Sequence, residues 1–284
     1  MSSVISPDQL LDERIAALHT QFTGLPGVLV AFSGGVDSGV VLAAAVRALG
    51  ADRVVAATAV SPSLPAAERA AAHDFATSLG VRHEQPRTDE LSRPGYVANA
   101  GDRCAFCKSE LVDVLTPLAA ELGIADVVTG TNADDLRAGF RPGIRAAAER
   151  GAWAPLARAG MTKDDVRAAA RRWGLPLADK PAAACLASRI AYGVPVSAAG
   201  LARVERAEAA LRAALADAGL PVRDLRVRDL GDDVARVEVD AALVPAVGPG
   251  LLAAVTGFAR VELDPRGFRS GAMNELLPDP VRYR

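Results

Sequence analysis

The segment from Ser33 to Ser38 (SGGVDS) carries residue types that can bind phosphate. Glycines let the backbone approach a ligand closely and adopt positive φ angles. A helix that begins in this segment has unpaired N–H groups in its first turn, and these attract anions. The carboxylate of Asp37 is better suited to a bound Mg²⁺ than to bare phosphate. The candidate nucleotide contacts are Ser33, Gly34, Gly35, Asp37 and Ser38.

Three cysteines form a second group of chemically active residues. Cys104 and Cys107 make a CxxC, and Cys185 lies far along the chain. The residues alone leave three interpretations open. The cysteines are buried and apolar, or the CxxC is half of a zinc site, or three thiolates hold a [4Fe-4S] cluster whose fourth iron carries an extra sulfide. The basic residues Arg103 and Arg189 lie close by in sequence, and positive charge stabilises thiolates.

Further polar residues follow apolar runs that read as strands. Thr131, Asn132 and Asp135 come after such a run, where ligands of open α/β sheets bind. An N-cap role for Asn132 is the structural alternative. Arg226 and Arg228 alternate along another expected strand, so both face the same side and could grip a phosphate. A solvated strand face is the alternative for this pair.

Strand and helix signals alternate over the first two thirds of the chain, which is typical of a parallel sheet covered by helices. The expected strands are 28–32, 54–60, 81–85 and 125–129, and the expected helices are 7–22, 37–49, 66–79, 108–122 and 162–173. The later segments predict a helix at 197–218 and strands at 225–227, 235–239 and 258–263. We therefore predict an α/β domain over residues 1–194 and a smaller α+β domain over residues 195–284.

Composition excludes several classes of protein. The chain has 284 residues with 50% hydrophobic content, enough for a sizeable core. The net charge of −2 disfavours a nucleic-acid partner. We find neither a basic start followed by an apolar run nor an uninterrupted apolar stretch of spanning length, so we expect a cytoplasmic location and no membrane partner.

The motifs together resemble the LarE family, the ATP-dependent sulfur transferases of nickel-pincer cofactor biosynthesis that serve lactate racemase. SGGVDS resembles the PP-loop of the N-type ATP pyrophosphatases, whose domains are adenine nucleotide alpha hydrolase-like. The resemblance covers most of the chain. The other segments that carry it are DRCAFCK (102–108), TGTNADD (129–135), FRPGIRAAAERGAWAPL (140–156), DKPAAACLASRI (179–190), RVR (226–228) and DPRGFRSGAMNE (264–275).

The resemblance implies a substrate and a reaction. The substrate is pyridinium-3,5-biscarboxylic acid mononucleotide. ATP with Mg²⁺ adenylates one ring carboxylate, pyrophosphate leaves, and a sulfur nucleophile displaces AMP to give a thiocarboxylate. The three cysteines imply the branch that holds a [4Fe-4S] cluster and needs a sulfide donor. In the other branch, the cysteine matching Cys185 gives up its own sulfur. The resemblance also implies a homo-oligomer and roles in the substrate site for Ser188, Arg189 and Glu208, the last matching an acidic metal contact.

Three rival functions stay open at this point. A tRNA-thiolating PP-loop enzyme shares the ATP chemistry but needs a basic surface for RNA. An amide synthetase that receives ammonia does not need three cysteines. A non-catalytic metal- or nucleotide-binding regulator would catalyse no exchange between ATP and pyrophosphate.

Overall fold

A computed structural model describes residues 6–137, 142–181, 184–269 and 271–276. The chain forms two compact units, each built from more than one stretch of sequence. Unit 1 comprises Met1–Ser61, Ala66–Thr88 and Cys107–Ala183, and unit 2 comprises Pro62–Pro65, Asp89–Phe106 and Ala184–Arg284. The domain boundary expected between residues 194 and 195 stays a prediction.

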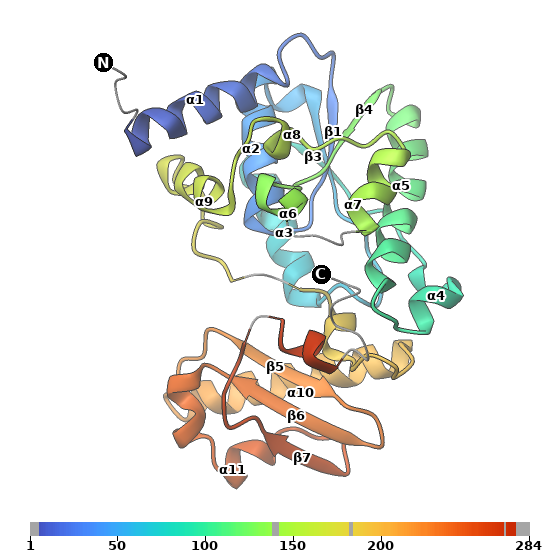
Figure 1. Cartoon of the computed structure of the whole chain (residues 1–284), viewed down its shortest axis with the longest axis vertical. Coiled ribbons are helices and arrows are strands. Elements are labelled where there is room, and N and C mark those ends of the chain that lie inside the picture. Colours follow the sequence, from blue (N-terminus) through green and yellow to red (C-terminus); the bar gives the residue numbers. More distant parts are fainter. Residues whose placement is uncertain (1–5, 138–141, 182–183, 270, 277–284) are drawn as a thin grey trace. The chain divides into compact units, whose positions relative to one another are not determined.

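Unit 1 is built on a four-stranded parallel sheet with strand order β3-β2-β1-β4 (Figure 1). The strands are β1 (Val28–Ala31), β2 (Val54–Ala57), β3 (Arg82–Glu84) and β4 (Asp126–Val128). β1 pairs with β2 from Val28↔Val54 and with β4 from Val28↔Asp126. β1 and β2 are almost wholly buried, as strands covered on both faces must be.

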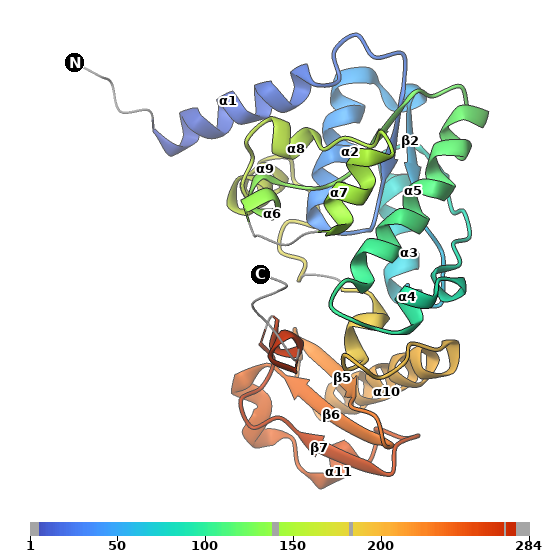
Figure 2. The same ribbon diagram turned by 45° about the vertical axis from the view of Figure 1, so that its right-hand side comes forward.

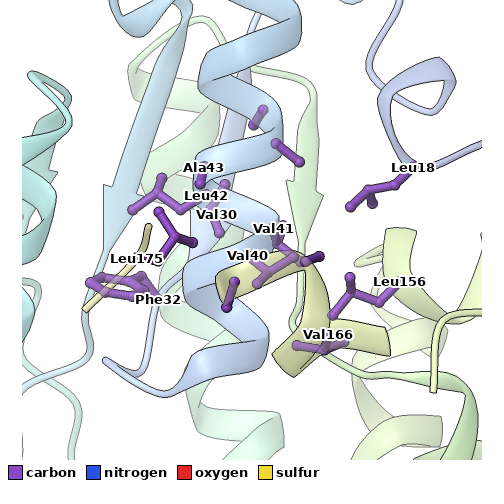
Figure 3. Packing of buried hydrophobic residues seen from close by; sticks show 14 of the residues in the cluster. Leu18, Val30, Phe32, Val40, Val41, Leu42, Ala43, Leu156, Val166 and Leu175 are labelled. Carbon is purple, nitrogen blue, oxygen red and sulfur yellow. The ribbon is translucent and has the colours of Figure 1, made fainter. Parts of the chain in front are cut away.

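Helices cover both faces of this sheet. The helices of unit 1 are α1 (Pro7–Thr20), α2 (Val36–Leu49), α3 (Ala66–Ser78), most of α5 (Arg103–Glu121), α6 (Ala133–Arg137), α7 (Pro142–Glu149), α8 (Pro155–Arg158) and α9 (Lys163–Arg172), with the 3₁₀ turn η1 (Ala51–Arg53). Alternate residues of β1 enter different cores. Val28 and Val30 pack with α1, α2 and α9, whereas Leu29 packs with α5 and α7. Figure 3 shows the first core around Val30, Phe32 and Leu42.

Unit 2 is an α+β arrangement. Its sheet has the order β5-β6-β7, with β5 (Leu225–Asp229) antiparallel to β6 (Val234–Val239) and β6 parallel to β7 (Arg260–Leu263). The long helix α10 (Ala198–Asp217) packs against this sheet through Leu211 and Leu215 (Figure 2). The shorter elements are α4 (Pro94–Val97), α11 (Pro249–Leu252), η2 (Glu90–Ser92), η3 (Leu186–Arg189), η4 (Ala241–Ala246) and η5 (Ala272–Leu276).

The predicted fold class is confirmed: an α/β fold with a four-stranded parallel sheet, together with a smaller C-terminal sheet. Two element boundaries differ from expectation by more than two residues. The expected strand 54–60 ends at Ala57, and the helix expected from residue 108 begins at Arg103, so the CxxC lies on a helix. Three of the family-like segments extend outside the described residues, at 140–141, 182–183 and 270. None of the helices in the described part of the chain is long and apolar enough to span a bilayer.

Candidate active site

The SGGVDS segment forms a tight turn between β1 and α2, as predicted. Gly34 has φ 74°, a conformation that glycine adopts without strain. Gly35 is the N-cap of α2, so the helix begins at Val36. Gly130, just after β4, approaches this turn so closely that a Cβ on it would lie 2.6 Å from the Ser38 amide nitrogen. The unpaired first-turn amides of α2 are thus held at the carboxyl end of the sheet.

The two serines of the loop have different roles. The Ser38 hydroxyl is buried, donates to the Gly35 carbonyl at 3.2 Å and accepts from the Ser33 amide at 3.2 Å. Its oxygen also lies 3.1 Å from the Ser33 hydroxyl. Ser38 therefore braces the loop from inside, and Ser33 is the serine exposed to solvent.

Asp37 lies between two donors that come from distant parts of unit 1. The Asn132 side-chain amide donates to one carboxylate oxygen at 3.0 Å, and the Lys163 ammonium pairs with the other oxygen. A carboxylate offers about four lone-pair positions. The residues present therefore fit a Mg²⁺ at Asp37, which would share this carboxylate or displace Lys163.

Asn132 also caps a helix, which is the structural alternative, and its role in a nucleotide site stays a prediction. Its carbonyl oxygen accepts from the amides of Asp134 and Asp135 at 2.9 and 3.1 Å, and its own amide donates to Asp135 at 3.2 Å. Asp135 thus closes the start of α6, and the Thr131 hydroxyl lies 3.3 Å from that of Thr129. The cap aims the Asn132 side chain at Asp37.

A second lysine contacts the loop from the other side. The Lys180 ammonium donates to the Gly34 carbonyl at 2.9 Å and to Glu68 of α3 at 2.7 Å. Sequence reasoning missed Lys163, Lys180, Glu68 and Gly130. One signal was available: the chain contains only three lysines among 32 basic residues, and two of the three contact this loop.

The cysteines are free thiols of differing exposure. Cys104 is exposed, whereas Cys107 and Cys185 are half-buried. Cys104 and Cys107 lie one turn apart on the same face of α5. Arg103, expected to stabilise a thiolate, is instead buried and donates to the Asn99 side chain and to the Ala187 carbonyl. Within the described ranges, no three His, Cys, Asp or Glu side chains group in a way that could hold a metal ion.

The segment around Cys185 is held from several directions within unit 2. Ser188 donates to the Cys185 carbonyl at 2.7 Å, and the Leu186 amide donates to Ser63 at 2.8 Å. Arg189 is buried and forms a two-pronged ion pair with Glu208 of α10, at 2.8 and 3.1 Å. Both Glu208 oxygens are thus engaged, so a metal ion at Glu208 would compete with Arg189.

Arg226 and Arg228 are buried, contrary to the alternative of a solvated strand face. Arg228 donates to the Ser188 carbonyl at 2.9 Å and to Glu238 at 2.8 Å. The Arg226 guanidinium lies 5.0 Å from the centre of the Phe268 ring.

Burial, together with the positive charges of Arg189 and Arg228, lowers the pKa of Arg226 to about 10. Arg189, Arg226 and Arg228 are thus three buried guanidinium groups whose positive charges act on one another, an arrangement suited to an anion.

The parallel sheet and its glycine-rich loop define a PP-loop protein of the ATP-utilising class. In agreement, residues 13–94, which carry the loop, match a family model described as NAD synthase. The chain is 42% identical over 94% of its length to an uncharacterised protein of Synechocystis, covering 99% of that protein. It is 35% identical to the pyridinium-3,5-bisthiocarboxylic acid mononucleotide synthase of Lactiplantibacillus plantarum, over 94% of this chain and 96% of that enzyme. The chain therefore belongs to the LarE family of ATP-utilising sulfur transferases.

Proposed function

We propose that this chain adenylates a carboxylate of pyridinium-3,5-biscarboxylic acid mononucleotide and converts it into a thiocarboxylate. The observation that carries the proposal is the SGGVDS loop, with Asp37 and Lys163 paired beside it, in a chain that aligns over 94% of its length with a named synthase of the corresponding bisthiocarboxylic acid. The products of the first step are the acyl adenylate and pyrophosphate.

Adenylation addresses the poor reactivity of a carboxylate, whose oxygens carry negative charge. Converting one oxygen into an acyl phosphate supplies a good leaving group. In this proposal the first-turn amides of α2 and the ammonium groups of Lys163 and Lys180 stabilise charge on the departing pyrophosphate. Mg²⁺ held at Asp37 supplies further charge neutralisation when bound.

The buried arginines of unit 2 are proposed to bind the monophosphate of the substrate. Arg189, Arg226 and Arg228 are buried, and the charges of Arg189 and Arg228 act on Arg226. The Nε of Arg228 is buried and has no hydrogen-bond partner among the described atoms. A phosphate near this position would supply an acceptor, and arginine suits bidentate recognition of phosphate.

The sulfur is proposed to come from the cysteines, with Cys185 essential. Cys104, Cys107 and Cys185 are free thiols, the donor type that a [4Fe-4S] cluster requires. When bound, a cluster with an open iron would supply sulfide for the new C–S bond. The competing source is the Cys185 sulfur itself, which leaves dehydroalanine.

An assay with purified protein, Mg-ATP and the biscarboxylic mononucleotide tests the proposal. We expect exchange of labelled pyrophosphate into ATP that depends on the mononucleotide, and a thiocarboxylate product detected by mass spectrometry. The Cys185→Ala variant should keep the exchange and lose the product. Full product formation by this variant would refute the sulfur role, and tight, salt-sensitive tRNA binding would favour the tRNA-thiolating rival.

A further inference from the structure

Two of the three histidines of the chain meet in unit 1, at residues to which no role has been given above. His73 lies on α3, and His83 lies on β3. Their Nδ1 atoms are 3.4 Å apart, and the two rings are stacked with centres 5.6 Å apart. His73 is exposed and His83 is half-buried, so solvent reaches the pair.

A buried threonine determines which nitrogen of His83 carries the proton. The Thr58 hydroxyl donates its one hydrogen to the Phe32 carbonyl at 2.7 Å. It can therefore only accept from the His83 Nε2, which lies 2.9 Å away. Neutral His83 is thus protonated on Nε2, and its Nδ1 directs a lone pair toward His73.

This arrangement is the one that metal-ligating histidines adopt. Such a histidine donates its second ring N–H to a polar oxygen, which orients the ring. Burial, with the nearby charge of His73, lowers the pKa of His83, so its neutral, ligating form prevails at neutral pH. The neighbouring Arg69 is positive but donates to Gln85 at 2.7 Å.

The separation of the two nitrogens matches one metal ion. Zinc binds imidazole nitrogen at about 2.0–2.1 Å, so two ligands of a tetrahedral site lie about 3.3–3.4 Å apart. A hydrogen bond between the rings would fit the same distance, but it needs the proton of His73 Nδ1, which a metal can replace. Two protein ligands leave the remaining positions to water.

We propose that His73 and His83 form a binding site for a borderline divalent transition metal such as Zn²⁺ or Ni²⁺, with Thr58 orienting His83. The bound metal links α3 to β3 and lies next to the end of β1, the strand that leads into the SGGVDS loop. Neutral imidazole is the ligand that suits such metals. The site is separate from the cysteines and from the proposed Mg²⁺ at Asp37.

The test uses tag-free protein in which all three cysteines are replaced by serine, so that thiols do not compete for metal. Zn²⁺ is titrated while the imidazole ¹⁵N resonances are followed. The Nδ1 signals of His73 and His83 should shift together at one equivalent. The third histidine, His19, is half-buried, stacks on Trp173 and serves as the internal control. The His73→Ala variant should lose Zn²⁺ binding at one equivalent, because it lacks one of the two protein ligands.

A second readout is stability, because a ligand that binds only the folded state raises the melting temperature. Zn²⁺ should raise it in the cysteine-free protein and not in the His73→Ala variant. Unchanged Nδ1 signals of His73 and His83 at saturating Zn²⁺ would overturn the proposal and leave a hydrogen bond between the rings. Equal Zn²⁺ affinity in the His73→Ala variant would overturn it as well.

Discussion

At the scale of single residues, the contiguous loop could be predicted from sequence, and its cationic partners could not. SGGVDS is recognisable because six adjacent residues specify a turn and a helix start. Lys163 and Lys180 reach the same loop across 126 and 146 residues of chain. Such contacts depend on how helix α9 and the segment after it fold back onto the sheet. No local sequence pattern predicts that path.

Lys180 provides a direct test of the phosphate site. The Lys180→Met variant should bind ATP and pyrophosphate about 10- to 100-fold more weakly, because a hydrogen bond to a charged group contributes about 1.5–3 kcal/mol. AMP affinity should change little. Titration calorimetry with the three ligands measures this. Arg171→Met is the matched control, since Arg171 pairs with exposed Asp179 and does not touch the loop. An equal loss for AMP would indicate a structural role instead.

Burial of the Arg226 guanidinium affects the stability of the fold. Its pKa of about 10 lies below the usual value for arginine, so burying its charge lowers stability at every pH below about 10. The penalty declines as the pH rises above that value. At pH 7 the Arg226→Met variant should therefore be as stable as the parent or more stable, by up to about 2 kcal/mol.

The same substitution should abolish the rise in melting temperature that the substrate mononucleotide gives the parent protein. Thermal unfolding with and without the mononucleotide measures both effects. Arg223→Met, at an exposed position before β5, is the control that should retain the response. A strongly destabilised Arg226→Met variant would contradict the account that burial of the Arg226 charge lowers stability.

At the scale of elements, the loop depends on how closely β4 approaches α2. A Cβ on Gly130 would strike the backbone of Ser38 at 2.6 Å, which cannot move without displacing the start of α2. A Cβ on Gly39 would lie 2.5 Å from the Leu177 Cδ1 atom, the flexible end of a side chain. A substitution by alanine therefore meets rigid backbone at Gly130 and a movable side chain at Gly39.

We expect Gly130→Ala to cost about 1–3 kcal/mol through overpacking and to weaken ATP binding. Gly39→Ala should be nearly neutral, because alanine favours the helix by about 1 kcal/mol and Leu177 can adjust. Urea unfolding and ATP titration of both variants measure the contrast. Equal losses of stability and of ATP affinity in the two variants would refute the role of Gly130 in holding the SGGVDS loop.

Element boundaries were predictable only where local signals decided them. Helix α9 begins after Thr162, whose hydroxyl accepts from the Asp165 amide, and this cap is visible in the sequence. The early start of α5 was not visible in the sequence. Arg103 donates to the Asn99 side chain and to the Ala187 carbonyl, which lie 4 and 84 residues away along the chain. Tertiary contacts thus added a first turn to α5, and that turn carries the CxxC.

At the scale of the whole molecule, the alternation of apolar strands and amphipathic helices was enough to predict the α/β class. The compact units depend on contacts between segments that are distant in sequence. The chain enters unit 2 at Pro62–Pro65 and again at Asp89–Phe106, long before its C-terminal sheet begins. Cys104 and Cys185 belong to unit 2, whereas Cys107 belongs to unit 1.

The cluster proposal makes a prediction for the intact chain. Protein purified without oxygen should contain about four iron and four sulfide per chain and absorb visible light. Each of Cys104→Ser, Cys107→Ser and Cys185→Ser should lower the iron content, since three thiolates are the required ligands. Arg103 offers the control for folding of the α5 turn, because Arg103→Met removes its ties to Asn99 and Ala187 and no thiol. Iron-free protein whose Cys185 loses mass on turnover, as conversion to dehydroalanine requires, would instead establish the sacrificial route.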